Sequence, residues 1–339
     1  MGPESPAAIT VLLPFRDARE HIYESLESLR AQTLEDFEVL MVDDGSSDGS
    51  RAIAESFRSR DSRFRLLDSP GHGLVDALNA GLAAACGEWI ARHDADDVCH
   101  PDRLEAQAAM ARSMPPRSVV SCMVESFRKG GVRKGYRLYE QWLNSLVDHE
   151  QIVRGIFIES PVPHPTAFYR REEVMAAGGY SDGDYPEDYE LWLRLWAGGF
   201  TFRRVPAVLL YWRDHPRRLS RTDPRYSVTS FYRIKASYLR KVPCLAGGSV
   251  TVWGSGQAGR RLSGFLLREG FVVEAFVTIV PERVGRTLRG VTIVSPDSLR
   301  PGSCAPVLVA SRAWGAREEI RCFLENRGFR EWKDYVLCA

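Results

Sequence analysis

A short apolar strand runs directly into an acidic turn in the segment Gly-Glu-Trp-Ile-Ala-Arg-His-Asp-Ala-Asp-Asp, residues 87–97. Because alternate residues of an extended chain point to the same side, Asp94 and Asp96 are expected to share a face at the end of the strand Trp89–Ala91. Two carboxylates aimed at one point suit Mg²⁺ or Mn²⁺, which take hard oxygen ligands together with phosphates. Taken alone, so short a pattern is more often a solvated acidic turn.

Strands and helices alternate through the first hundred residues around this turn. Apolar runs predict strands at Ile9–Phe15, Phe37–Val42, Phe64–Leu67 and Glu88–Ala91. Helical spacing predicts helices at Arg19–Gln32, Asp48–Arg58 and Leu74–Ala85. This alternation predicts an α/β fold with a parallel sheet that is covered on both faces. Ligands of such sheets lie beyond the carboxyl ends of the strands, which is where the acidic turn falls.

A second acidic turn, Asp43-Asp44-Gly45-Ser46, follows the expected strand at 37–42. A carboxylate at this place can accept a hydrogen bond from the imide N–H of a uracil or thymine ring. The same residues also suit a tight turn that caps the next helix. The pattern alone does not separate these two interpretations.

A third acidic group, Glu187-Asp188, follows Pro186 at the start of an expected helix. Proline followed by acidic residues is a common helix start, because the N-terminus of a helix favours negative charge. The functional alternative makes Asp188 a general base that removes a proton from an acceptor hydroxyl, with burial or Glu187 raising its pKa. On this segment alone the structural interpretation is favoured.

The alternating pattern restarts after residues 243–248, which mark an expected domain boundary. There a G-x-G-x-x-G turn at residues 254–259 lies between the strand Ser249–Trp253 and a helix, the context in which such turns cradle phosphate groups. Dinucleotide-binding folds hold a ribose with an acidic residue at the end of the next strand, but here Val277 is followed by Thr278. The domain is therefore expected to be vestigial or regulatory, with dinucleotide binding the less favoured alternative.

The bulk composition is that of an ordinary globular protein of one or two domains. The chain has 339 residues and a formal net charge of +1, which offers no argument for nucleic-acid binding. Its seven cysteines include no C-x-x-C pair, which argues against a thiolate zinc site and for reduced thiols in the cytoplasm. We expect neither a signal peptide nor a membrane span, so any membrane contact is expected to be peripheral.

In their order along the chain, these motifs resemble the family 2 inverting glycosyltransferases. The matching segments are 11–15, 42–49, 73–81, 87–97, 164–166, 178–180, 187–194 and 211–213. The resemblance covers roughly residues 8–220 and implies a GT-A fold, a Rossmann-like and mostly parallel sheet with an acceptor-side extension. It places a glycosyltransferase domain at residues 1–242, with a nucleotide-sugar half at about 8–115 and an acceptor half at about 116–242. Residues 246–339 look like a small Rossmann-like accessory domain.

The resemblance also implies a reaction and its residues. The donor would be a nucleotide sugar, commonly a UDP-sugar, and the acceptor a glycan or lipid-linked hydroxyl in cell-surface glycan or polysaccharide synthesis, met at the inner membrane face. The residues that it assigns to the donor are Pro14, Phe15, Arg16, Asp43, Asp44, Asn79, Asp94 and Ala95. It assigns Asp96 and His215 to a Mn²⁺ or Mg²⁺ ion, and Asp188, with Glu187 beside it, to general-base catalysis.

Two features depart from the family pattern. Leu78 stands where many relatives carry an arginine before the asparagine, so the charge of the diphosphate falls on the metal, Arg92 or Arg16. No Q-x-x-R-W motif follows the helix at 188, which favours a single addition over processive synthesis.

Two other functions remain as alternatives. A sugar nucleotidyltransferase also uses paired aspartates and a metal, but it needs a glycine- and lysine-rich loop after the first strand. A nucleotide-binding module without transferase activity would be built on the glycine turn at 254–259.

Overall fold

The computed structural model describes residues 8–311 and 315–339, except residues 70 and 72. The chain forms two compact units. The first consists of residues up to 153 together with 161–183 and 187–222, and the second consists of 154–160, 184–186 and 223–339. Among the described residues, no helix is both long enough and apolar enough to cross a membrane.

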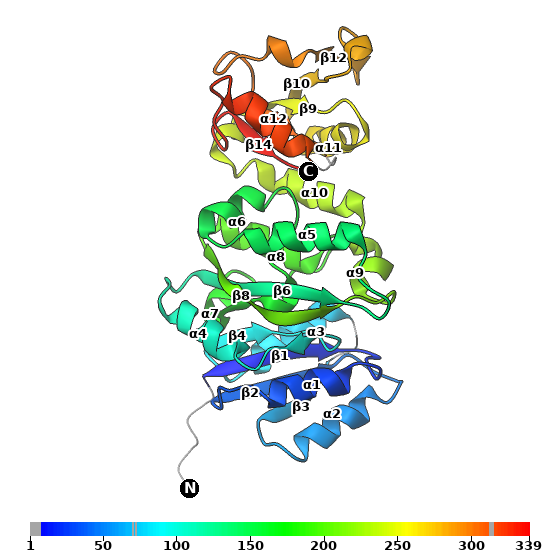
Figure 1. Cartoon of the computed structure of the whole chain (residues 1–339), viewed down its shortest axis with the longest axis vertical. Coiled ribbons are helices and arrows are strands. Elements are labelled where there is room, and N and C mark those ends of the chain that lie inside the picture. The colour runs from blue at the N-terminus through cyan, green and yellow to red at the C-terminus, as the bar shows by residue number, and fades with distance from the viewer. Residues whose placement is uncertain (1–7, 70, 72, 312–314) are drawn as a thin grey trace. The chain divides into compact units, whose positions relative to one another are not determined.

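The first unit is built on an eight-stranded sheet (Figure 1). Its strands are β1 (Ile9–Phe15), β2 (Phe37–Asp43), β3 (Phe64–Asp68), β4 (Trp89–Arg92), β5 (Val98–Cys99), β6 (Ser118–Phe127), β7 (Phe168–Arg170) and β8 (Thr201–Arg213). They lie in the order β3-β2-β1-β4-β7-β6-β8-β5. The first four in this order are parallel, β7 is antiparallel to both neighbours, and β6 is parallel to β8. The predicted α/β fold with a mostly parallel sheet is confirmed.

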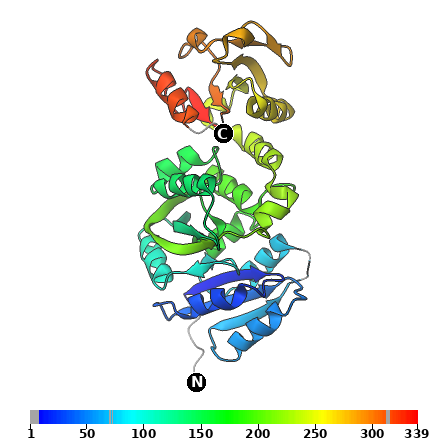
Figure 2. The ribbon, with the colours of Figure 1, turned by 45° about the vertical axis from the view of Figure 1, so that its right-hand side comes forward.

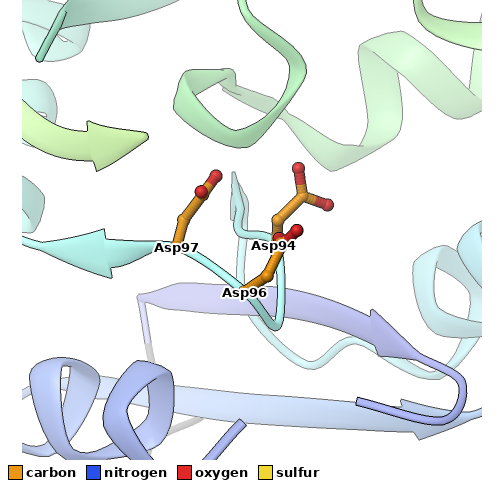
Figure 3. A group of neighbouring side chains, drawn as sticks. All are labelled: Asp94, Asp96 and Asp97. Carbon is orange, nitrogen blue, oxygen red and sulfur yellow. The ribbon is translucent and has the colours of Figure 1, made fainter. Parts of the chain in front are cut away.

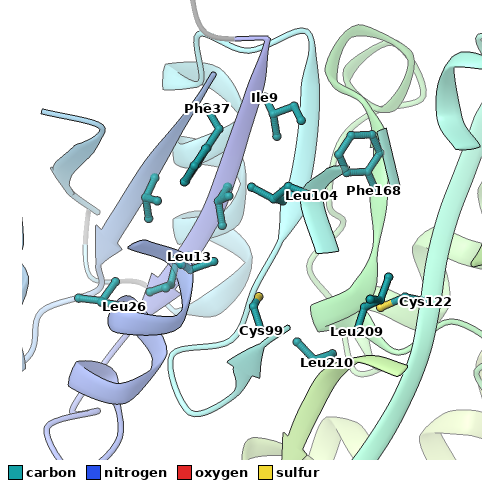
Figure 4. Packing of buried hydrophobic residues seen from close by; sticks show 14 of the residues in the cluster. Ile9, Leu13, Leu26, Phe37, Cys99, Leu104, Cys122, Phe168, Leu209 and Leu210 are labelled. Carbon is teal, nitrogen blue, oxygen red and sulfur yellow. The ribbon is translucent and has the colours of Figure 1, made fainter. Parts of the chain in front are cut away.

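Helices cover both faces of this sheet. The helices between residues 22 and 222 are α1 (Ile22–Arg30), α2 (Ser50–Arg58), α3 (Leu74–Ala84), α4 (Arg103–Arg112), α5 (Lys134–Ser145), α6 (His149–Gly155), α7 (Arg171–Ala176), α8 (Glu187–Ala197) and α9 (Leu219–Thr222). Val11 and Leu13 of β1 point to the face where α1, α2 and α4 pack, as the side chains around Leu13, Leu26 and Leu104 show (Figure 4). Leu12 points to the opposite face, where α3 and α8 pack. Every residue of β1, β2 and β4 is buried, as expected for strands covered on both sides.

The buried carboxylate of Glu38 in β2 contacts β1, β3 and the segment that precedes β4. It accepts hydrogen bonds from Thr10 Oγ1 at 2.5 Å, Arg65 Nη1 at 2.5 Å and Cys86 N at 2.8 Å. Burial alone would raise the pKa of Glu38, but these three donors hold it below its ordinary value. Glu38 therefore stays ionised and fastens β1 to the start of β4 through its neighbours.

The second unit contains a smaller sheet that is also mostly parallel. Its strands are β9 (Ser249–Trp253), β10 (Val272–Val277), β11 (Thr287–Leu288), β12 (Val291–Val294), β13 (Val307–Val309) and β14 (Tyr335–Leu337), in the order β11-β12-β10-β9-β13-β14. All neighbours are parallel except β11 and β12. Its helices are α10 (Val228–Leu239), α11 (Gln257–Arg268) and α12 (Ala316–Glu325), and α11 and α12 lie on opposite sides of the strands (Figure 2). The strands predicted at 249–253 and 272–277 are those observed.

The expected domain boundary and the boundary of the compact units differ. The sequence places the end of the first domain between residues 242 and 246, whereas α10 and the segment from 223 onward belong to the second unit by compactness. Short segments at 154–160 and 184–186 also belong to the second unit. Where an independently folding glycosyltransferase domain ends therefore stays a prediction.

Candidate active site

The acidic turn after β4 brings three carboxylates together. Asp94, Asp96 and Asp97 rise from the loop between β4 and β5, and their candidate ligand oxygens all lie within 4.8 Å of one another (Figure 3). Because β1, β2 and β4 are adjacent and parallel, their carboxyl ends lie at one edge of the sheet. The second acidic turn, which follows β2, is at the same edge.

A buried hydrogen-bond chain holds this loop in place. Arg103 Nη1 lies 3.1 Å from His93 Nδ1, and its Nη2 donates to the carbonyl of Arg92 at 2.6 Å. Burial, and next the charge of Arg103, lower the pKa of His93, so the imidazole is neutral and accepts from Arg103. Its Nε2–H then faces Ser25 Oγ at 3.0 Å, and Ser25 donates to the carbonyl of Asp94 at 3.1 Å. A chain of hydrogen-bond donors, from the cation Arg103 through neutral His93 to Ser25, therefore positions the loop.

The end of β8 holds the loop from the other side. The backbone N–H of Arg213 donates to Asp97 Oδ1 at 2.9 Å, and Arg213 Nε donates to the carbonyl of Asp96 at 2.7 Å. Two residues further on, His215 Nε2 lies 2.7 Å from Asp96 Oδ2. The structure thus brings together Asp96 and His215, the two residues that the sequence assigned to a metal, although 119 positions separate them.

Asp97 was not among the predicted ligands, and it is the most informative of the three carboxylates. It is 1% exposed, and its Oδ2 is a buried oxygen without a hydrogen-bond partner among the described residues. Burial, followed by the charges of Asp96 and Asp94, raises the pKa of Asp97. A buried carboxylate oxygen with no donor is costly unless it meets a cation. The donor set therefore fits a hard divalent ion held by carboxylate oxygens and an imidazole nitrogen.

Arg218 is a second residue that the sequence did not single out. Its Nη1 donates to Tyr136 Oη at 2.7 Å, and its guanidinium lies 4.4 Å from the centre of the Trp212 ring. Burial would lower the pKa of Arg218, but Tyr136 and the three aspartates of the loop outweigh it and raise the pKa. The composition of the basic stretch 213–221 is that of a solvated turn, so only the folded chain shows that one of its cations faces the acidic loop.

The carboxylates after β2 are both buried and both engaged. Asp43 is 3% exposed, and its Oδ1 accepts from Ser46 N at 2.9 Å while Arg51 Nη1 lies 3.2 Å from its Oδ2. Asp44 Oδ2 lies 3.6 Å from Arg16 Nη1, whose side chain is 56% exposed. The turn interpretation of this segment therefore has direct geometric support, whereas α2 begins after Gly49 without a side-chain cap. Recognition of a uracil or thymine ring by Asp43 stays a prediction.

The other residues assigned to the donor differ in what they can offer. Phe15 and Ala95 are buried in the hydrophobic core, and Pro14 is buried in β1. Asn79 donates from Nδ2 to the carbonyl of Tyr180 at 2.8 Å and accepts from its N–H at 2.9 Å. Asn79 thus connects α3 to the Gly178-Gly179-Tyr180 turn, and its contact with a donor stays a prediction.

The predicted base lies at the start of α8. Asp188 is half-buried, and its Oδ1 accepts from Tyr189 N at 2.7 Å. Burial, and next the charge of Glu187, raise the pKa of Asp188 well above its ordinary value, so these effects outweigh the helix terminus that would lower it. Glu187 is 1% exposed, with its Oε1 3.7 Å from His164 Nδ1, and is thus a buried neighbour.

The buried cation Arg92 interacts electrostatically with both the acidic loop and the carboxylates at the start of α8. Arg92, at the end of β4, is 1% exposed and forms an ion pair with Asp94. Asp94 and Glu187 both help to raise the pKa of Arg92, and Arg92 in turn opposes the rise in the pKa of Asp188. Asp94 and the α8 carboxylates therefore belong to one charged cluster, although they lie in separate motifs of the sequence.

Comparison with known proteins identifies the family. The model of glycosyl transferase family 2 matches residues 10–178. The chain is 31% identical over 204 residues to the amylovoran biosynthesis glycosyltransferase AmsE of Erwinia amylovora, a match that covers 60% of this chain and 74% of that one. The chain belongs to glycosyltransferase family 2 and is a glycosyltransferase.

A second relative and a solved structure extend the comparison. The UDP-Gal:alpha-D-GlcNAc-diphosphoundecaprenol beta-1,3-galactosyltransferase of Escherichia coli is 25% identical over 241 residues, which is 70% of this chain and 84% of that one. The crystal structure of S. aureus TarS 1-349 in complex with UDP-GlcNAc superposes with a TM-score of 0.54 at 18% identity, covering 78% of this chain and 73% of that chain. This structural likeness confirms the expected GT-A fold of the family.

Proposed function

We propose that the chain is an inverting, metal-dependent glycosyltransferase that moves a sugar from a nucleoside diphosphate, UDP foremost, to an acceptor hydroxyl. The observation that carries the proposal is the acidic loop, in which Asp96 meets His215 and Asp97 keeps one buried oxygen without a donor among the described residues. This loop lies at the sheet edge that also carries Asp43 and Asp44. The diphosphate of a donor bound there would lie near Asp96, Asp97 and His215, the residues that would hold a cation.

The proposed reaction is a single in-line displacement. The acceptor oxygen attacks the anomeric carbon, the bond from that carbon to the phosphate oxygen breaks, and its electron pair leaves with the nucleoside diphosphate. Asp188 takes the proton of the acceptor hydroxyl, a role that the raised pKa of this carboxylate supports. Asp96, Asp97 and His215 would hold a Mg²⁺ or Mn²⁺ ion, which would supply positive charge to the departing diphosphate.

Arginine side chains of the protein would also stabilise the negative charge of the departing diphosphate. Arg218 faces the acidic loop and is held by Tyr136 and Trp212, so its guanidinium is fixed before a donor arrives. It is a better candidate for the diphosphate than the exposed Arg16 or the buried Arg92, which is paired with Asp94. Fixed charges of this kind stabilise a developing negative charge without reorganisation.

The names of two relatives support an acceptor class. One of them is named for amylovoran biosynthesis and another for transfer to a sugar on diphosphoundecaprenol. We infer that this chain acts in the synthesis of a cell-surface glycan or polysaccharide and meets a lipid-linked acceptor at the inner membrane face. The segments that would read the acceptor lie between residues 120 and 165.

Release of UDP from UDP-sugars in the presence of Mn²⁺ tests the proposal. We expect the wild type to release UDP slowly without acceptor, and chelator or Asp96→Asn to reduce release by at least about 100-fold. Asp102→Asn removes an exposed carboxylate that pairs only with His100 in the part described, and it is the matched control. Release that is unaffected by both chelator and Asp96→Asn would refute the metal-dependent mechanism.

A further inference from the structure

A cavity of about 500 Å³ opens in the second unit at the carboxyl ends of its parallel strands. Trp253 ends β9, Val277 ends β10, and Ala310 directly follows β13, and all three line the cavity. The chain passes from β9 to β10 on one side and returns to β13 on the other, so the order of the strands reverses here. Such a reversal is where open α/β sheets bind their ligands, and the volume is that of a small-molecule site.

The glycines of the turn at 254–259 have two different explanations. A Cβ on Gly254 would lie 2.8 Å from the carbonyl oxygen of Ala310, and one on Gly259 would lie 1.7 Å from the carbonyl oxygen of Gly254, so both are required by packing. Gly256 has an ordinary extended backbone, with φ −85° and ψ −162°, and a Cβ there would meet nothing within 4 Å. The fold does not require glycine at 256, but a ligand that approaches the backbone there would.

Polar groups of the cavity have unused hydrogen-bond donors. Ser255 and Thr278 are 4% and 6% exposed, and both line the cavity. Each accepts one hydrogen bond, from Arg283 Nη1 at 3.4 Å and from Val280 N at 3.3 Å, and neither hydroxyl donates one within the described chain. Arg283 forms no ion pair with any other described residue. These donors, with the start of the 12-residue helix α11, form a site for an anion.

Part of the remaining wall of the cavity is apolar, and Gln257, Ser311 and Glu319 also line the cavity. Trp253 and Phe323 meet edge to face with 5.3 Å between their ring centres, and Val277 and Ile320 lie beside them. A planar base suits this apolar part of the wall. Thr278 stands where a carboxylate would hold the ribose of a dinucleotide, so a full dinucleotide is disfavoured.

We propose that this cavity binds a nucleoside diphosphate, with the phosphates on Gly256, Ser255 and Arg283 and the base against Trp253 and Phe323. The site is separate from the acidic loop and goes beyond the proposed glycosyl transfer. It would make the second unit a nucleotide-responsive module rather than a vestigial domain.

Two matched pairs of variants test this inference in the full chain. Gly256→Asp places a carboxylate at the expected phosphate position yet suits the N-cap of α11, so the protein should fold as well as the wild type. Gly256→Asn is its neutral control of the same size. Arg283→Gln removes the cation without an ion pair, and Arg286→Gln removes an exposed arginine that does not line the cavity.

Binding of ADP, UDP, NAD⁺ and inorganic phosphate is measured by calorimetric titration in the presence of chelator, together with melting temperatures. We expect ADP or UDP to bind the wild type, Gly256→Asp to weaken binding at least about 30-fold and Gly256→Asn by only a few-fold. Arg283→Gln should weaken binding about tenfold, and Arg286→Gln should not. Affinity for both nucleoside diphosphates that Gly256→Asp leaves unchanged would overturn the proposal, as would phosphate or NAD⁺ binding more tightly than either.

Discussion

Asp188→Asn separates the catalytic role proposed for this carboxylate from its effect on stability. Asparagine Oδ1 keeps the acceptor for the N–H of Tyr189, which lies 2.7 Å from Asp188 Oδ1, so the start of α8 is preserved. The amide cannot take up a proton, and loss of a general base reduces turnover by about 10²- to 10⁴-fold. This corresponds to a barrier higher by about 2.7–5.4 kcal/mol.

The same substitution should stabilise the folded protein at pH 7. Burial, and next the charge of Glu187, raise the pKa of Asp188, so the ionised form is disfavoured in the folded state. An acid with a raised folded pKa loses stability as the pH rises from its unfolded to its folded pKa, and the penalty persists above that window. Because asparagine stays neutral, we expect the variant to melt at a higher temperature than the wild type at pH 7.

Turnover is followed by UDP release and stability by the melting temperature. A gain of about 1 kcal/mol in a unit of this size raises the melting temperature by about 2–4 °C. Asp102→Asn is the control, since it removes an exposed carboxylate and should change neither quantity. An Asp188→Asn variant that turns over within about threefold of the wild type, or that melts at a lower temperature, would contradict the reasoning.

Three further perturbations address neighbouring groups. Glu187→Gln removes the second of the causes that raise the pKa of Asp188, so the acid limb of the kcat/KM profile should move to lower pH; an unmoved limb contradicts the assigned base. Arg218→Gln should weaken donor binding and turnover by about 10- to 100-fold, whereas the exposed Arg217→Gln should leave both unchanged in the same titration and UDP-release assays. Glu38→Gln should cost about 1–3 kcal/mol of unfolding free energy at pH 7. This cost should shrink toward pH 3, because a lowered folded pKa contributes stability that is lost as the pH falls through it. Urea unfolding at both pH values measures the difference. An equal cost at both pH values would contradict the ion-pair account.

The parallel half of the first sheet could be predicted because its signal is local. β1 and β2 are mostly apolar runs that are buried at every residue, and the helix between them carries the spacing of one apolar face. The carboxyl ends of parallel strands meet at one edge whatever their lengths, so the sequence alone suffices to place the acidic turns after β2 and β4 together.

The antiparallel strands of the first sheet could not be predicted in the same way. β7 has three residues and β5 has two, and each pairs antiparallel with a strand far along the chain. Pairing over such distances leaves no periodicity in a short segment. The position of Arg218 depends on tertiary contacts, namely its stacking against Trp212 and its hydrogen bond to Tyr136. The composition of the basic loop is that of an ordinary solvated turn, so it does not reveal these contacts.

The acidic loop shows why the cation and the donor should bind together. Asp94 pairs with Arg92, Asp96 meets His215, and Asp97 Oδ1 accepts from the backbone N–H of Arg213, so the chain supplies a partner for each carboxylate. Asp97 Oδ2, however, is a buried oxygen without a hydrogen-bond partner within the described residues. A divalent ion would satisfy this oxygen but would still need further oxygen ligands, which the phosphates of a donor provide. Each should therefore raise the affinity for the other by the same factor, as linkage requires.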